Sequence, residues 1–262
     1  MKNSGKIRCA LTMAGSDSGG GAGIQADMLA FASNGVFATS AVAAITAQNP
    51  DGVRAIQAVS PEVFAAQIDA VFDFFKPDAV KTGMLFNAEL ISAAAAALRA
   101  RDVPAVVDPV MVSTSGARLL CDDAADALRR ELLPAACLIT PNLDEARELL
   151  GREISDMEAA AEDLSRMFGV SVLLKGGHLA GGKITDVLKI RNAGARVWES
   201  SRVENVDTHG SGCTLSAAIA AFLARGFALE NAVDSARKYL LAGMKNPVET
   251  GGKNFINHFP EK

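Results

Sequence analysis

Short runs of apolar and β-branched residues alternate along the chain with longer, alanine-rich stretches whose apolar positions repeat at helical spacing. The short runs predict strands, because a strand buried on both faces is apolar along its whole length. These runs are residues 7–13, 40–47, 79–81, 105–107, 138–140 and 170–175. The longer stretches predict helices, since their apolar side chains gather on one face. These stretches are residues 23–33, 61–74, 87–101, 122–133, 144–150, 157–168, 213–225 and 230–245.

Strands that alternate with helices form βαβ units, whose strands run parallel and whose helices cover the sheet. Two further runs, residues 184–190 and 195–199, flank the turn sequence RNAGA and predict a β-hairpin. Neither a low-complexity linker nor an internal repeat interrupts the sequence. We therefore expect an α/β fold of three layers, a central, mostly parallel sheet with helices on both faces, in one domain spanning residues 1–262.

Polar or glycine-bearing turns follow the predicted strands. They read AGSDSGGGAG, TAQN, KTGM, DPVM, TPNLDE and LKGGH in chain order. Ligands of open α/β sheets bind beyond the carboxyl ends of the strands, so these turns are typical of an active-site rim. Any α/β fold needs turns there, and the pattern alone identifies no chemistry.

Composition narrows the class of protein. Of the 262 residues, 49% are apolar, which is enough for a large core. The net charge of −4 provides no general basic patch, so we expect no nucleic-acid partner. Four cysteines without a C-x-x-C pair indicate a reduced, cytoplasmic setting. The first residues lack the apolar run of a signal peptide, and no stretch is long enough to span a bilayer, so no membrane partner is expected.

The stretch DTHGSGCTLSAA, residues 207–218, places a lone thiol at the start of a predicted helix. Gly210, Ser211, Gly212 and Cys213 would present backbone N–H groups at the helix N-terminus, which form an anion site. The helix dipole would stabilise the charge of a transferring phosphoryl group and favour the Cys213 thiolate. The alternative is a tight turn in which Cys213 packs as a small apolar residue.

A second glycine cluster, AGSDSGGGAGIQAD, follows the first predicted strand. It fails the dinucleotide-binding pattern because Ile24 stands where the third glycine belongs, and the sequence contains no Walker-type phosphate loop. Its glycines still require backbone freedom or close approach of a ligand. Asp27, in the helix that follows, either points into the cleft or faces solvent.

The stretch TPNLDEA begins another helix. Asn142 is placed as its N-cap and Glu145 at the spacing of a capping box, and both also offer oxygens to a hydrated magnesium ion.

Lys175 ends a strand and could either reach a phosphate or be solvated. The three histidines are too scattered to predict a zinc site. Together, two anion sites, a magnesium pair and a lysine indicate phosphoryl transfer from a nucleotide.

These motifs, in this order between about residue 7 and residue 245, resemble the hydroxymethylpyrimidine/phosphomethylpyrimidine kinases of thiamin biosynthesis. That family belongs to the ribokinase-like superfamily. The resemblance implies the ribokinase-like fold, a homodimer, and ATP with Mg²⁺ as phosphoryl donor. It also implies two phosphorylations, first of the hydroxymethyl group and then of the monophosphate.

The resemblance also implies roles for particular positions. The segment from Gly210 to Cys213 resembles the anion hole, with Cys213 where most sugar-kinase relatives carry an aspartate base. Lys175 and Thr208 resemble phosphate- and ATP-binding positions, and Asn142 and Glu145 the magnesium-associated pair, acting through water. The positions that resemble the pyrimidine pocket are Gly15, Ala22, Asp27, Gln48, Met84 and Val110.

Two alternatives stay open at this point. A pyridoxal kinase shares the fold and also acts on a small heteroaromatic ring with a hydroxymethyl group. A non-catalytic pyrimidine- or nucleotide-binding regulator would need no transfer site, which argues against it. Cys213 itself is either a general base for the first phosphorylation or a neighbour of the anion hole that acts through its field.

Overall fold

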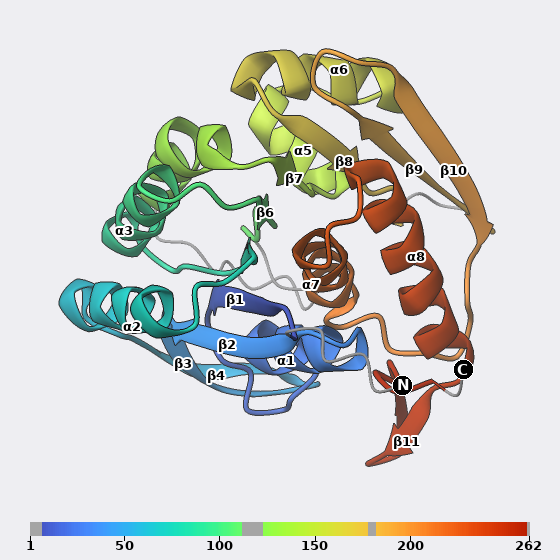
Figure 1. Cartoon of the computed structure of the whole chain (residues 1–262). Helices are drawn as coiled ribbons and strands as arrows, with labels where there is room; N and C mark the ends of the chain where they lie inside the picture. The colour runs from blue at the N-terminus through green and yellow to red at the C-terminus, as the bar shows by residue number, and fades with distance from the viewer. Residues whose placement is uncertain (1–6, 112–122, 178–181, 261–262) are drawn as a thin grey trace, which may run out of the picture.

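Eight strands form the central sheet in this computed structural model, which describes residues 7–111, 123–177 and 182–260 (Figure 1). The strand order is β10-β9-β8-β7-β6-β5-β1-β2. The bounds are β1 (Cys9–Ala14), β2 (Phe37–Val42), β5 (Ala79–Thr82), β6 (Ala105–Val107), β7 (Leu138–Ile139), β8 (Ser171–Leu174), β9 (Lys183–Lys189) and β10 (Ala195–Ser201). The strands from β2 to β8 in this order pair in parallel, whereas β9 and β10 are antiparallel and form the predicted hairpin. The prediction of a mostly parallel sheet is confirmed.

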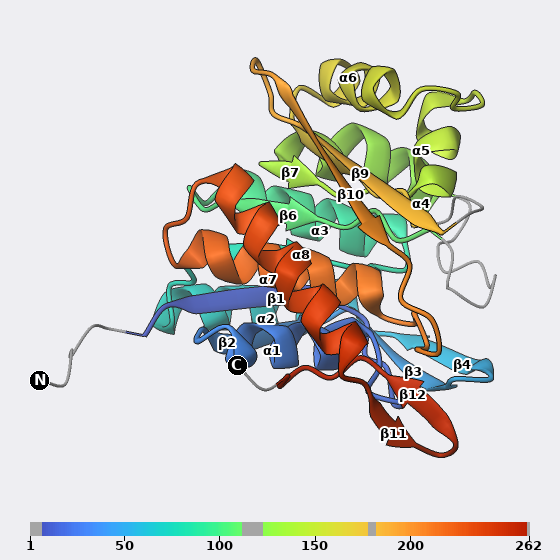
Figure 2. The ribbon, with the colours of Figure 1, turned by 90° about the vertical axis from the view of Figure 1, so that its right-hand side faces the viewer.

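Helices cover both faces of the sheet. One buried core joins the sheet to α1 (Gly23–Ser33), α7 (Ser211–Ala224) and α8 (Leu229–Lys245). A second core, on the other face, joins it to α2 (Pro61–Phe74), α3 (Ala88–Arg99), α4 (Ala124–Ala127), α5 (Leu143–Leu150) and α6 (Met157–Phe168). Figures 1 and 2 show these layers from two directions. Among the residues described, no helix combines the length and the apolar character needed to cross a membrane.

Local sequence signals explain where several helices begin and end. Ser60 and Asn87 accept hydrogen bonds from backbone N–H groups in the first turns of α2 and α3, as N-cap residues do. Gly151 and Gly169 end α5 and α6 in the left-handed conformation. The predicted helix 122–133 is more irregular: α4 continues as a π-helical turn (Leu128–Leu132) and a 3₁₀ turn (Leu133–Ala135), and residue 122 lies outside the described residues.

The predicted strand 40–47 is wrong as a single element. The chain leaves the central sheet after Val42, and β3 (Ala44–Asn49) pairs instead with β4 (Gly52–Ala58) in a separate antiparallel hairpin. A run of small and β-branched residues without a turn signal hides this change of sheet. The sequence also did not predict β4 or the short hairpin of β11 (Val248–Thr250) and β12 (Lys253–Phe255). Both hairpins project from the same end of the molecule in Figure 2.

Candidate active site

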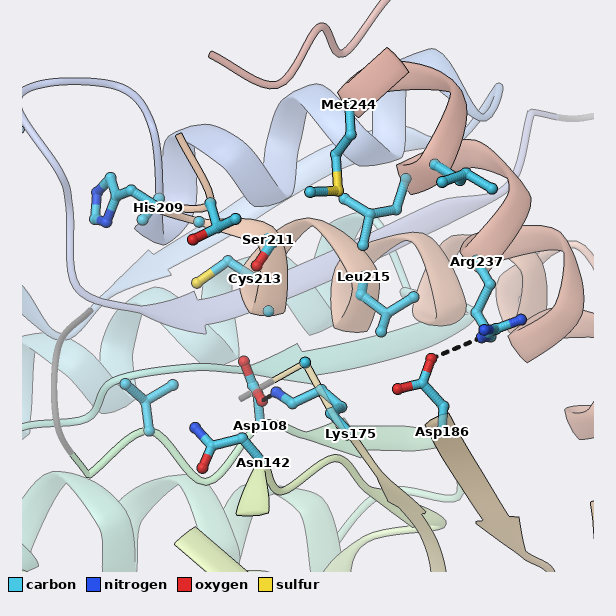
Figure 3. Close-up of a pocket in the computed structure, with 18 of the residues that line it drawn as sticks. Asp108, Asn142, Lys175, Asp186, His209, Ser211, Cys213, Leu215, Arg237 and Met244 are labelled. Atoms are coloured by element: carbon cyan, nitrogen blue, oxygen red, sulfur yellow. Dashed lines mark hydrogen bonds and ion pairs between the residues drawn. The ribbon is translucent and has the colours of Figure 1, made fainter. Parts of the chain in front are cut away.

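A cavity of about 530 Å³ opens beyond the carboxyl ends of the parallel strands, beside the N-terminus of α7 (Figure 3). Its walls come from segments far apart in sequence, as expected for a rim of strand-end turns. Thirteen of the fourteen predicted site residues line it: Gly15, Ala22, Gln48, Met84, Val110, Asn142, Glu145, Lys175, Thr208, Gly210, Ser211, Gly212 and Cys213.

Asp27 is the predicted site residue that does not line the cavity. Its side chain is fully buried, and both carboxylate oxygens lie 2.8 Å from Lys81 Nζ. The Thr12 hydroxyl donates a third hydrogen bond, 2.6 Å long, to Asp27 Oδ2. Lys81 lines the cavity in its place. The expectation of a direct contact between Asp27 and a ligand therefore needs correction: Asp27 reaches the cavity through Lys81, whose pKa it raises against the effect of burial.

The start of α7 is shaped by two glycines. Gly210 has a φ of +78°, and a Cβ on it would lie 1.7 Å from the carbonyl oxygen of Gly21. A Cβ on Gly212 would lie 3.2 Å from Lys175 Nζ. These glycines let the AGSDSGGGAG segment, which contains Gly21, and the Lys175 ammonium approach the helix start, where first-turn N–H groups lack intrahelical partners. The arrangement is suited to an anion.

Asp108 is a site residue that the sequence reasoning missed. It follows β6, is 3% exposed, and its Oδ1 accepts hydrogen bonds of 2.8 Å from Lys175 Nζ and from the Thr140 hydroxyl. Burial raises the pKa of Asp108, but the charges of Lys175 and Lys81 outweigh it and hold the pKa below its ordinary value. Figure 3 shows this ion pair opposite the start of α7. An aspartate directly after a buried strand was the available signal.

Asn142 and Glu145 form the predicted capping box. Asn142 Oδ1 accepts from the Glu145 N–H at 2.9 Å, and Glu145 Oε2 accepts from the Asn142 N–H at 2.8 Å. Burial raises the pKa of Glu145 to about 7, opposed by Lys175 and reinforced by Asp108. A cation would favour the charged form of this carboxyl group, so the pair fits a magnesium ion that keeps most of its waters. Within the described ranges, no group of three or more acidic, histidine or cysteine side chains offers a fuller metal site.

Cys213 lies in the first turn of α7, on the cavity wall. Burial raises the pKa of its thiol to about 11, although the charge of Lys81 lowers it. The expectation of a thiolate favoured by the helix N-terminus is therefore wrong for the free protein. Desolvation of the thiolate, reinforced by the charges of Asp27 and Asp108, outweighs the charge of Lys81 and the hydrogen bond from the Gly23 N–H.

A contact between Asp17 and His209 joins the two glycine-rich segments, AGSDSGGGAG and DTHGSGC. His209 Nε2 lies 2.9 Å from Asp17 Oδ2 and 3.1 Å from the carboxamide nitrogen of Gln48. Asp17 and His209 are 192 positions apart, so no local pattern in the sequence indicates the pair.

The other end of the cavity lies between the β9–β10 hairpin and α8. Arg237 Nε of α8 lies 2.9 Å from Asp186 Oδ2 of β9, and Trp198 Nε1 of β10 donates to Asp234 Oδ1 of α8 at 3.1 Å. The Arg237 guanidinium also lies 5.2 Å from the centre of the Trp198 ring. Leu215 and Met244 add apolar surface to this end (Figure 3).

The sequence profile of the family described as "Phosphomethylpyrimidine kinase" matches residues 17–258. The chain belongs to this family. A hydroxymethylpyrimidine/phosphomethylpyrimidine kinase from Rhizobium meliloti is 49% identical over 95% of this chain and 96% of its own length. The sequence-based assignment to the phosphomethylpyrimidine kinases, and hence to kinases, is confirmed.

Solved structures agree with this family. A phosphomethylpyrimidine kinase from Clostridium difficile 630 is 40% identical, with a TM-score of 0.80 over 90% of this chain and 98% of its own. An ADP complex of Bacillus subtilis pyridoxal kinase is 35% identical, with a TM-score of 0.87 over 97% of this chain and 98% of its own. The fold of this chain is thus the ribokinase-like fold that the resemblance implied.

Proposed function

We propose that this chain uses ATP with Mg²⁺ to phosphorylate 4-amino-5-hydroxymethyl-2-methylpyrimidine and then its monophosphate, supplying the diphosphate for thiamin biosynthesis. The observation that carries the proposal is one cavity that combines a helix start suited to an anion, near Lys175, with a mixed polar and apolar wall around Gln48 and Met84. The names of the relatives support the same substrate.

The ring-binding wall suits an aminopyrimidine. The Met84 side chain packs so closely on Gly15 that a Cβ at that position would lie 2.6 Å from Met84 Cε. Ala22 and Val110 add small and apolar surface to the same cavity. A flat ring fits against such a wall, while the Gln48 carboxamide hydrogen-bonds to its polar edge.

In the first transfer, the hydroxyl oxygen bonds to the γ-phosphorus, the bond from that phosphorus to ADP breaks, and the hydroxyl proton must leave. The α7 start and Lys175 stabilise the charge on the transferring group. We assign the proton to Cys213, acting through the minor thiolate form that a pKa of about 11 allows, about 10⁻⁴ of the thiol at pH 7. In the second transfer the acceptor is already an ionised phosphate, so a base matters less.

Asn142 and Glu145 would hold magnesium through water, and Lys175 and Thr208 would contact the phosphates. Bound magnesium would neutralise phosphate charge. Asp108 fixes the Lys175 ammonium at the end of β8 and thereby positions it beside Gly212.

The test offers ATP and Mg²⁺ with hydroxymethylpyrimidine, its monophosphate and pyridoxal in parallel, with products identified by mass spectrometry. We expect the pyrimidine monophosphate to form first and the diphosphate to follow. Phosphorylation of pyridoxal alone would refute the pyrimidine assignment but keep the kinase. ADP release that does not depend on any acceptor would refute both.

We also propose that the chain forms a homodimer, as the resemblance implies, in the reduced, cytoplasmic setting that its cysteines indicate. Light scattering of the purified protein should then give twice the chain mass of 27.2 kDa. A mass of one chain at micromolar concentration would contradict the dimer.

A further inference from the structure

An acid–imidazole pair, Asp17 and His209, lies beside Gln48 in the cavity wall. Asp17 is 3% exposed and the His209 side chain 17%, and the two are joined at 2.9 Å. Neither residue has a role in the transfer as described above. Their contact with Gln48 connects them to substrate recognition.

The partners of Asp17 determine where His209 carries its proton. Asp17 Oδ1 accepts from the Gly19 N–H at 2.8 Å, and Oδ2 accepts from the Ala22 N–H at 2.9 Å. Burial raises the pKa of Asp17, but hydrogen bonds from His209 and Gly19 outweigh it and lower the pKa below its ordinary value. An ionised carboxylate only accepts hydrogen bonds, so His209 Nε2 must carry a hydrogen and donate it to Asp17.

That hydrogen restricts the carboxamide of Gln48. Nε2–H of His209 cannot accept a hydrogen bond, so the Gln48 amide nitrogen, 3.1 Å away, would oppose one donor with another. The two ends of a carboxamide are alike in shape, and hydrogen-bond partners decide which way it faces. His209 therefore selects the orientation with the Gln48 oxygen towards Nε2.

Thr46 independently selects the same orientation. Its hydroxyl donates its single hydrogen to the Ser16 carbonyl oxygen at 2.8 Å and lies 3.5 Å from the other end of the Gln48 carboxamide. With that hydrogen used, the Thr46 oxygen can only accept from Gln48. Turning the carboxamide by 180° lets its oxygen share the Nε2–H hydrogen with Asp17 and directs its NH₂ group towards Thr46, another residue of the cavity wall.

We propose that Asp17 and His209 are positioning residues that hold Gln48 with its NH₂ group on the Thr46 side of the cavity wall, so that the wall offers donors to a ring nitrogen of the acceptor. This inference rests on the proposed function, because it explains how the ring-reading side chain of that site is oriented. Under this proposal, Asp17 and His209, which lie on two different loops, determine the specificity of the site for a ring edge that accepts hydrogen bonds.

The first test needs no substrate. Nitrogen-15 NMR of the free protein reports the protonation of each ring nitrogen of His209, assigned by the loss of its signals in His209→Gln. Protonated Nε2 is the expected result. A neutral ring protonated at Nδ1 would overturn the proposal. If the wild-type chain fails to phosphorylate the pyrimidine, the proposed function fails, while this measurement still decides the positioning.

The second test measures whether His209 acts through Gln48. His209→Ala should raise the KM for the pyrimidine about tenfold, as one oriented hydrogen bond is lost, with a smaller change in kcat and none in the KM for ATP. Gln48→Ala should give a similar effect, and the double variant should be no worse than either single variant. His209→Gln, which keeps an N–H donor, should recover most of the affinity.

Ser18→Ala provides the matched control. The Ser18 hydroxyl bonds to the Gln48 backbone, donating to the carbonyl oxygen and accepting from the N–H at 2.7 Å each, without touching the carboxamide. His209→Ala should therefore keep its full effect in the Ser18→Ala background. Additive effects of His209→Ala and Gln48→Ala, or an equal loss of kcat with every acceptor, would refute the positioning role and indicate a disturbed helix start.

Discussion

At the scale of single residues, Cys213 is subject to opposing influences. Burial, the largest effect, raises the pKa of its thiol to about 11, whereas the charge of Lys81 and a hydrogen bond from the Gly23 N–H favour the thiolate. Cys213→Ser and Cys213→Ala should slow phosphorylation of the free alcohol by about 10²–10⁴-fold, the usual contribution of a general base. The second phosphorylation should slow much less. Single-turnover measurements of both steps test this, and equal slowing of both steps would instead indicate a disturbed anion site.

The same pKa predicts a pH dependence. Below about pH 11 the thiolate fraction of Cys213 grows about tenfold per pH unit. The single-turnover rate of the first step in wild type should rise with pH between 6 and about 9, and this rise should disappear in Cys213→Ala. A pH profile unchanged by the substitution would exclude Cys213 as the base.

Glu145 links stability to pH. Its pKa is raised from 4.5 to about 7, so the folded protein holds this proton more tightly than the unfolded chain. The free energy of unfolding therefore loses this contribution as the pH rises from 4.5 to 7. Glu145→Gln retains an acceptor for the capping box and removes the titration, so its melting temperature relative to wild type should be higher at pH 8 than at pH 5. A melting-temperature difference between Glu145→Gln and wild type that does not vary with pH would contradict the raised pKa of Glu145.

The affinity of Glu145→Gln for magnesium in the presence of ATP should also fall, as measured by calorimetry.

At the scale of elements, the two ends of α7 provide a matched comparison. Gly210 and Gly226 both have positive φ, but only Gly210 would place a Cβ against backbone, 1.7 Å from the Gly21 oxygen. Gly226→Ala should cost about 1 kcal/mol of unfolding free energy, from backbone strain, with kinase activity retained. Gly210→Ala should cost about 1–3 kcal/mol more and abolish most activity, because the loop and helix start must separate. Denaturant titrations and kinase assays test both; equal effects of the two substitutions would argue against the close contact.

The elements that the sequence predicted share a strong local signal. The buried strands β1, β5, β6 and β8 and the helices with polar caps were recognisable, because apolar runs and cap residues are local features. β4 was missed since Arg54 and Gln57 interrupt its apolar alternation and most of its side chains are partly or fully exposed. Its partner β3 continues the composition of β2, so the boundary at Ala43 carries no signal.

The site residues that could be predicted from the sequence are those whose motif also places them at a strand end or a helix start. Glycines, Asn142, Glu145 and Lys175 stand at strand ends or helix starts and do line the cavity. Asp27 was misplaced because a sequence cannot tell which partner a helical carboxylate meets, and its partner Lys81 lies 54 positions away. The contacts of Asp17 with His209 and of Asp108 with Lys175 likewise depend on which loops the fold brings together.

At the scale of the whole molecule, the β9–β10 hairpin extends the sheet beyond its parallel part and closes one end of the cavity. Its contacts with α8 join residues on both strands to one helix: Asp186 to Arg237, Trp198 to Asp234, and Arg196 to Glu230. A hairpin at a sheet edge would otherwise be among the first parts to open. Here its opening must break ion pairs to a helix that packs on α7.

The consequence concerns hydrogen exchange. Backbone amides of the hairpin and of α8 should exchange with deuterium as one cooperative unit, with similar opening free energies, although they are separated along the chain. Arg237→Ala removes the contact with Asp186 and the stacking on Trp198, so hairpin amides should then exchange faster than those of α8. Hydrogen exchange measured by mass spectrometry of peptic fragments distinguishes coupled from independent opening. Independent exchange of the hairpin and α8 in the wild-type protein would show that the contacts between them are too weak to couple their opening.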